Sequence, residues 1–236
     1  MMTDPILRVE SIHTFIGQFH ILEGVSFAVP PGSITVLLGR NGAGKTTTLR
    51  SIMALTPPRK GSISFEGQSL ARQRPFHIAR RGIGYVPEQR AIFSALSVRE
   101  NLEIAERQHG ELRHRQAFIF DLFPDLQRLY EYPGGQLSGG QQQMLAIARA
   151  LVPDNRLLLI DEPSEGLAPV VIQQLMIAIR KLAAQATVLL VEQNFRMASQ
   201  LADHYVIIDD GRAVAAGNMP DLVADPALVQ RYLGAT

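Results

Sequence analysis

Short runs of apolar and β-branched residues recur along the chain, with polar turns between them. Each run is four or five residues long, which is the length of a buried strand and far short of the roughly 20 residues that cross a bilayer. We expect strands at residues 6–9, 25–29, 34–38, 62–65, 157–160, 187–191 and 205–208.

Helix-like segments separate several of these strands. Their periodicity predicts helices over residues 45–54, 141–151 and 170–184. Alternating strands and helices indicate an α/β fold with a mainly parallel sheet covered on both faces. The first strands follow one another more directly, which suggests an antiparallel β layer near the N-terminus.

The stretch from about residue 90 to residue 135 has a different pattern. It contains no convincing strand, is helix-like over residues 98–108 and 113–130, and ends in the breaker Pro133-Gly134-Gly135. We interpret it as a helical lobe inserted into a single domain of residues 6–236. Proline breaks after Gly217 suggest a short C-terminal appendage, about residues 218–236.

Composition narrows the function classes. The 236 residues are 46% hydrophobic and carry a formal charge of +1, so we expect an ordered globular protein without a basic stripe for nucleic acid. The lack of cysteine excludes disulfides, thiolate zinc sites and cysteine nucleophiles, and the six histidines show no metal-ligand spacing. Residues 1–5 do not resemble a signal peptide, so any membrane role requires a partner.

A glycine-rich segment between a predicted strand and a predicted helix matches the G-x-x-x-x-G-K-[ST] pattern of phosphate-binding loops. In such a loop backbone N–H groups surround the phosphates, the lysine reaches the β/γ oxygens, and the hydroxyl can ligate Mg²⁺. A turn that merely tolerates lysine and threonine is the alternative. The predicted nucleotide-binding residues are Gly39, Arg40, Asn41, Gly42, Ala43, Gly44, Lys45, Thr46 and Thr47.

Two adjacent acids, Asp161 and Glu162, follow the apolar strand at residues 157–160. The carboxyl edge of a parallel sheet is also where phosphate loops lie. We expect Asp161 to hold Mg²⁺ together with Thr46, and Glu162 to act as general base on the attacking water. Alone, the pair could simply mark where the strand reaches solvent.

Leu137-Ser138-Gly139-Gly140-Gln141 precedes a predicted helix and lies between these two motifs. The segment resembles the signature motif of the ABC (ATP-binding cassette) ATPases, and the resemblance extends from about Leu7 to about Gly217. It implies a P-loop fold with a RecA-like core, bound ATP and Mg²⁺, and a dimer in which Ser138, Gly139, Gly140 and Gln141 grip the nucleotide of the other subunit. An ordinary capped helix is the alternative.

Four positions depart from the commonest pattern of that family, and one of them is Ala168, which stands where an aspartate is usual. The resemblance places Glu88 where a γ-phosphate-sensing and Mg²⁺-site glutamine is usual, with Gln89 next to it, and either residue could serve. Gln193 stands at the switch-histidine position; it can hydrogen-bond a phosphate but cannot titrate near neutral pH. At the adenine position the family has an aromatic residue, whereas Ile16 is in register here and Phe15 precedes it.

Three short sequences are similar to those of the shorter ATPase of branched-chain amino acid importers. They are Val86-Pro87-Glu88, Gly166-Leu167-Ala168-Pro169 and Val191-Glu192-Gln193-Asn194. This implies a second cassette, identical or paralogous, membrane-spanning permease subunits, an indirect solute-binding protein, and a place on the cytoplasmic face of the cell membrane. Importers of urea, amides or aromatic acids are alternatives. A soluble regulatory cassette and an ATP-binding module without turnover are rivals from other classes.

Overall fold

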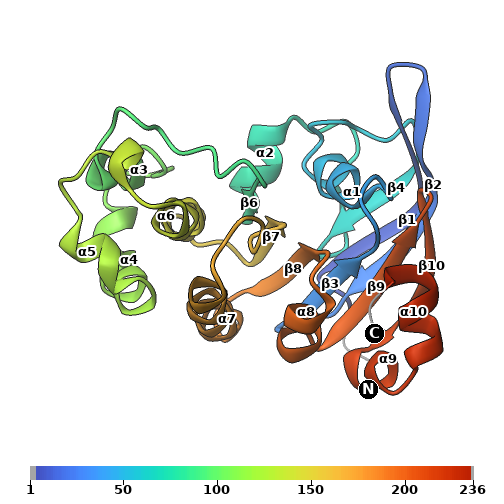
Figure 1. Ribbon diagram of the computed structural model, residues 1–236. Coiled ribbons are helices and arrows are strands. Elements are labelled where there is room, and N and C mark those ends of the chain that lie inside the picture. The colour runs from blue at the N-terminus through green and yellow to red at the C-terminus, as the bar shows by residue number, and fades with distance from the viewer. Residues whose placement is uncertain (1–3, 235–236) are drawn as a thin grey trace.

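The computed structural model describes residues 4–234 (Figure 1). Residues 1–3 and 235–236 lie outside the described part, and they include most of the segment considered for a signal peptide and the end of the predicted C-terminal appendage. None of the helices in residues 4–234 is both long and apolar enough to cross a membrane.

A four-stranded sheet forms from the first part of the chain, and all of its pairs are antiparallel. This confirms the expected N-terminal antiparallel layer. The first two strands extend well beyond the predicted runs because they form one long hairpin. In spatial order the strands are β2 (Phe19–Val29), β1 (Leu7–Ile16), β4 (Lys60–Phe65) and β5 (Gln68–Ser69).

The central sheet has six strands, and five of them run parallel to one another. The sixth, β10, pairs antiparallel with β9 at one edge. This mainly parallel sheet confirms the predicted α/β class. In spatial order the strands are β10 (Arg212–Asn218), β9 (His204–Asp209), β3 (Ile34–Leu38), β8 (Thr187–Glu192), β7 (Leu157–Asp161) and β6 (Ile83–Val86).

Alternate residues of the central strands face two different hydrophobic cores. Leu157 and Leu159 of β7 pack into the core shared with the antiparallel sheet, whereas Leu158 and Ile160 pack into the core on the other face. Burial on both faces explains why these strands read as continuous apolar runs. The helices around the sheet are α1 (Lys45–Ile52), α2 (Pro75–Arg80), α6 (Gly139–Leu151), α7 (Pro169–Ala183), α8 (Phe195–Leu201), α9 (Met219–Val223) and α10 (Pro226–Leu233).

Strands β6 and β10 were not among the predicted strands. β6 contains Gly84, which lowers strand propensity, yet a Cβ there would lie 2.6 Å from the Asn155 amide nitrogen and from a Leu158 methyl group. The glycine therefore permits close packing of β6. β10 is an edge strand made largely of small residues, and none of its residues is fully buried.

Between β6 and α6 the chain forms four helical elements and one isolated antiparallel bridge, between Ser97 and Pro133. The helical elements are α3 (Val98–Glu103), α4 (Glu111–Leu122), α5 (Pro124–Arg128) and the short η1 (Gly134–Gln136). The two long helices predicted here are wrong in length. The first ends five residues early, and the second is interrupted because Pro124, which has no N–H, begins a new helix. The helices of residues 90–135 agree with the helical pattern from which the lobe was interpreted, and its insertion as a lobe stays a prediction.

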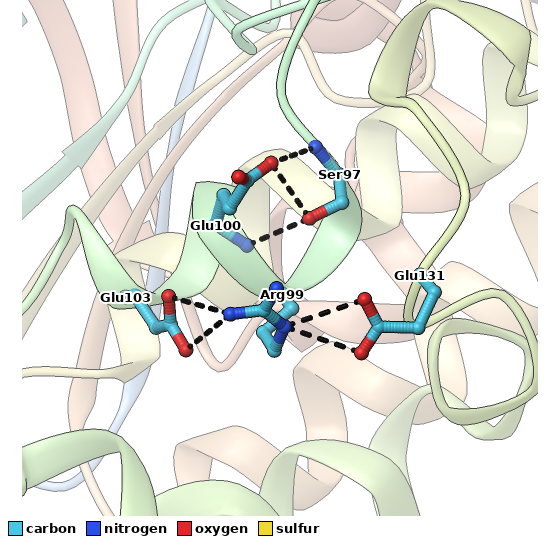
Figure 2. Close-up of polar contacts among 5 residues, drawn as sticks. All are labelled: Ser97, Arg99, Glu100, Glu103 and Glu131. Carbon is cyan, nitrogen blue, oxygen red and sulfur yellow. Dashed lines mark hydrogen bonds and ion pairs between the residues drawn. The ribbon is translucent and has the colours of Figure 1, made fainter.

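A capping box begins α3 (Figure 2). The Ser97 hydroxyl accepts a hydrogen bond from the Glu100 N–H at 3.1 Å, and the Glu100 carboxylate accepts one from the Ser97 N–H at 2.7 Å. In the same turn, Arg99 donates hydrogen bonds to both Glu103 and Glu131. These contacts join α3 to the segment that leads into η1.

Candidate functional site

The loop between β3 and α1 depends on glycine at both ends. Gly39 has φ 154°, and a Cβ there would lie 2.1 Å from the carbonyl oxygen of Ile208. Gly44 has φ 107°, and its Cβ would meet a Leu22 methyl group at 2.7 Å. The loop therefore packs too closely on β9 and β2 to admit side chains at these positions.

Lys45 extends from the first position of α1 back into the loop. Its ammonium donates hydrogen bonds to the carbonyl oxygens of Gly39 and Arg40, at 3.0 and 3.1 Å. It also forms an ion pair with a Glu162 carboxylate oxygen at 3.1 Å, and only 4% of the lysine side chain is exposed. The structure thus joins the phosphate-loop lysine directly to the predicted general base, which the sequence alone did not show.

Asp161 ends β7 and is fully buried. One of its oxygens accepts a hydrogen bond from the Thr46 hydroxyl at 3.0 Å, and the other accepts one from the Tyr85 hydroxyl at 3.3 Å. Burial raises the pKa of the Asp161 carboxyl, and the Thr46 hydrogen bond opposes that rise. No signal in the sequence pointed to Tyr85, which the parallel pairing of β6 with β7 places beside this carboxylate.

Thr46, in the first turn of α1, and Asp161, at the end of β7, supply two adjacent oxygen atoms that can ligate a metal ion. A hydroxyl and a carboxylate are ligands that suit Mg²⁺, and Asp161 is buried without an ion-pair partner among the described residues. These two residues therefore fit the predicted metal site. Gln89, the third predicted ligand, hydrogen-bonds neither of these residues.

Glu162 follows β7, and its backbone N–H donates to the Val191 carbonyl of β8 at 3.0 Å. Its φ is +42°, in the left-handed region that non-glycine residues rarely adopt. Such backbone strain is concentrated at functional sites. Here it accompanies a partly exposed carboxylate that lies beside the phosphate loop.

A hollow of about 380 Å³ lies over the phosphate loop. It brings together residues that are far apart in the sequence, and two of them, Ile21 and Glu165, were not predicted. Gly39, Arg40 and Ala43 belong to the loop but do not line the hollow. Its lining consists of Ile16, Ile21, Asn41, Gly42, Gly44, Lys45, Thr46, Thr47, Glu88, Glu162 and Glu165.

Of the two candidate sensor residues, Glu88 lies at this hollow. Burial raises the pKa of the Glu88 carboxyl, and the neighbouring Glu165 raises it further. Gln89 instead lines, together with Glu88, a second hollow of about 500 Å³ that Gln142 and Gly166 also border. The structure therefore places Glu88, not Gln89, beside the phosphate loop.

Of the two candidate adenine contacts, Ile16 lines the hollow and is 49% exposed. The Phe15 ring stacks on His20, with ring centroids 4.2 Å apart, and the Arg59 guanidinium lies 4.4 Å from the Phe15 centroid. Phe15 is therefore engaged in packing along the hairpin and does not line the hollow.

The Ser138 segment forms the N-terminus of α6. The Ser138 hydroxyl accepts from the Gln141 N–H at 3.3 Å, and the Gln141 side chain accepts from the Ser138 N–H at 3.0 Å, so the expected cap is a full capping box. Ser138 and Gly139 are exposed, and neither lines the hollow at the phosphate loop. In Figure 1, α6 and α1 lie on opposite sides of β7.

Gln193 lies just after β8 and is exposed. It borders a hollow of about 300 Å³ together with Glu162, Ser164, Glu165, Glu192 and Asn194. The predicted switch residue is thus close to the predicted general base. Glu192, its buried neighbour, was not singled out by its sequence.

Comparisons with known proteins agree on the architecture. The family model described as ABC transporter matches residues 22–165. The chain is 40% identical to the high-affinity branched-chain amino acid transport ATP-binding protein BraG of Pseudomonas aeruginosa, over 97% of this chain and all of that protein. It is 34% identical to the probable branched-chain amino acid transport ATP-binding protein LivF of Archaeoglobus fulgidus, over 92% of this chain and 94% of that one.

The fold also resembles that of solved ATP-binding cassettes. A cassette of an ABC transporter in its ADP conformation superposes with a TM-score of 0.86 at 27% identity, covering 99% of this chain and all of that one. A nucleotide-free cassette of an ABC transporter gives a TM-score of 0.84 at 26% identity, covering 96% and 98%.

Proposed function

Since the chain belongs to the ABC transporter family and is an ATPase of that family, we propose that it powers the uptake of branched-chain amino acids or related small solutes through separate permease subunits. The relatives named for branched-chain amino acid transport support this substrate class because they match nearly the full length of the chain. The geometry around Lys45, Thr46, Asp161 and Glu162 supports ATP hydrolysis.

The ion pair between Lys45 and Glu162 is the observation that best supports ATP hydrolysis at this site. A polyphosphate in the loop attracts the Lys45 ammonium and weakens its 3.1 Å ion pair with Glu162. The Glu162 carboxylate then accepts a proton from the water that attacks the γ-phosphorus, and the bond from that phosphorus to the β–γ bridging oxygen breaks, so that ADP leaves. The loop N–H groups and Lys45 bind the phosphate oxygens. Thr46 and Asp161 would hold Mg²⁺, which would neutralise negative charge on the phosphates.

The other predicted site residues bind or sense the nucleotide in this proposal. Glu88 and Gln193 border the hollows beside Glu162, and so lie where they can respond to the γ-phosphate. Ile16 forms the adenine side of the hollow without the stacking that an aromatic ring provides. The Ser138 segment binds the nucleotide of a second cassette, since in its own chain it does not border the phosphate-loop hollow.

A groove beside β6 is the proposed contact with the permease. It has a volume of about 310 Å³ and is bordered by three arginines, Arg90, Arg107 and Arg149. Burial lowers the pKa of the Arg107 and Arg149 guanidinium groups. The segment that carries Glu88 also borders this groove through Pro87, so a movement at the hollow can reach the partner there.

Affinity purification of the chain from its own membranes, followed by identification of the associated proteins, tests the proposal. Two hydrophobic permease subunits and a cassette, identical or paralogous, are expected, with the chain on the cytoplasmic face of the membrane. The associated binding protein then identifies the solute to be tested. Recovery of ribosomal or chromosomal proteins would leave the ATPase chemistry standing and remove the transport role.

A further inference from the structure

Glu192 is a buried acid beside the phosphate loop. It has no role in the proposed hydrolysis reaction. It is the last residue of β8, and 1% of its surface is exposed. Its neighbour Val191 accepts the Glu162 N–H, so the ends of β7 and β8 are joined at this point. Glu192 therefore lies on the strand next to the general base.

The Glu192 carboxylate connects two loops. It accepts hydrogen bonds from the Ser164 N–H at 3.2 Å and from the Ser164 hydroxyl at 2.9 Å, and Ser164 is two residues after Glu162. It also accepts from the Asn194 N–H at 3.3 Å, and Asn194 follows Gln193. One side chain thus fixes the segment after the general base against the segment that carries the switch residue.

The connection extends into α8. The Asn194 side chain accepts a hydrogen bond from the Met197 N–H at 3.0 Å and so caps the first turn of that helix. The two loops, together with Glu192, enclose the hollow of about 300 Å³ that Glu162 also borders. A shift of either loop therefore changes the place of Glu162 or Gln193.

The surroundings of Glu192 disfavour its ionised form, because the side chain is buried and its charged neighbours at the hollow are acids. The charged residues that share this hollow are the acids Glu162 and Glu165, and Lys45 is paired with Glu162. Among residues 4–234, Glu192 has no ion-pair partner. A buried carboxyl without a basic partner is expensive unless hydrogen bonds compensate, and such groups are often found at functional sites.

From this geometry we propose that Glu192 is a positioning residue for ATP hydrolysis, which holds Glu162 and Gln193 in register through Ser164 and Asn194. The inference rests on the proposed role of Glu162. Burial raises the pKa of Glu192 to about 7, whereas the hydrogen bonds from Ser164 and Asn194 oppose the rise. The ionised form, which offers all its lone pairs to these donors, is the one that maintains the connection.

The test compares Glu192→Ala, Glu192→Gln and Ser164→Ala in the full chain, with Glu131→Gln at an exposed glutamate of the helical segment as matched control. We expect Glu192→Ala to lower kcat by about 10-fold to 100-fold, with the Kd for ATP unchanged within about 2-fold, because the phosphate loop is intact. Ser164→Ala, added to Glu192→Ala, should lower kcat little further, since both act through one connection.

The pH dependence separates positioning from general destabilisation. The kcat of the wild type should rise as pH increases through about 7, and the kcat of Glu192→Gln should lack that rise. Wild-type kcat in Glu192→Ala, or equal losses of kcat and ATP affinity, would overturn the proposal. Glu162→Gln, measured in parallel, tests the general base itself: if it loses turnover and Glu192→Ala does not, only the positioning role fails.

Discussion

At the scale of single residues, the sequence predicted candidate site residues but not the contacts between them. The phosphate-loop pattern predicted Lys45 and Thr46, and the two acids that follow an apolar strand predicted Asp161 and Glu162. The ion pair between Lys45 and Glu162 depends on the strand order β3-β8-β7, which a motif does not encode.

Replacing Gly39 by alanine should destabilise the protein and weaken nucleotide binding. The new Cβ would lie 2.1 Å from the Ile208 carbonyl oxygen, so the loop must move. We expect a loss of about 2–3 kcal/mol in the free energy of unfolding, measured by urea denaturation. Gly67→Ala is the control, because Gly67 also has positive φ but open space around it, and about 1 kcal/mol is expected there. Equal losses in the two variants would contradict the argument.

The buried Glu192 carboxyl should make stability depend on pH. Its pKa is raised from 4.5 to about 7 in the folded chain, so between these values the folded state binds more protons than the unfolded state. The free energy of unfolding should therefore fall as pH rises through this range, by about 3 kcal/mol relative to Glu192→Gln. Denaturation at several pH values checks this; parallel curves for the two proteins would show that Glu192 does not titrate there.

At the scale of elements, the continuous apolar runs were predicted well, whereas strands that contain glycine or mainly small residues were not. The strands β3, β7 and β8 are buried on both faces and read as continuous hydrophobic segments. β6 carries a glycine that its close contacts with Asn155 and Leu158 explain. The helices α4 and α5 share one apolar pattern, and Pro124 alone divides them.

The capping box of α3 supplies a test of the helical segment (Figure 2). Ser97→Ala removes the hydroxyl that accepts the Glu100 N–H, and should lower the free energy of unfolding by about 1 kcal/mol. Ser199→Ala, whose exposed hydroxyl donates to a carbonyl within α8, should change it less. A thermal or urea melt compares them, and an equal effect would mean that the cap contributes nothing specific.

At the scale of the whole molecule, the fold could be predicted because strand–helix alternation and the phosphate loop both point to the same α/β class. The position of the Ser138 segment relative to the phosphate loop could not be predicted, because it depends on where the fold places α6. In one chain Ser138 and Gly139 do not border the phosphate-loop hollow. A second copy or a paralogue, bound head to tail, is the arrangement that we propose to unite them.

The most direct test of this account is the behaviour of Glu162→Gln with ATP and Mg²⁺. We predict that the variant binds ATP, loses turnover by about 100-fold or more, and forms a stable dimer with itself or with a paralogous cassette, measured by light scattering, whereas Lys45→Ala binds ATP poorly and stays monomeric. Hydrolysis by Glu162→Gln at the wild-type rate, or an ATP-bound variant that stays monomeric both alone and with the paralogous cassette, would contradict this proposal.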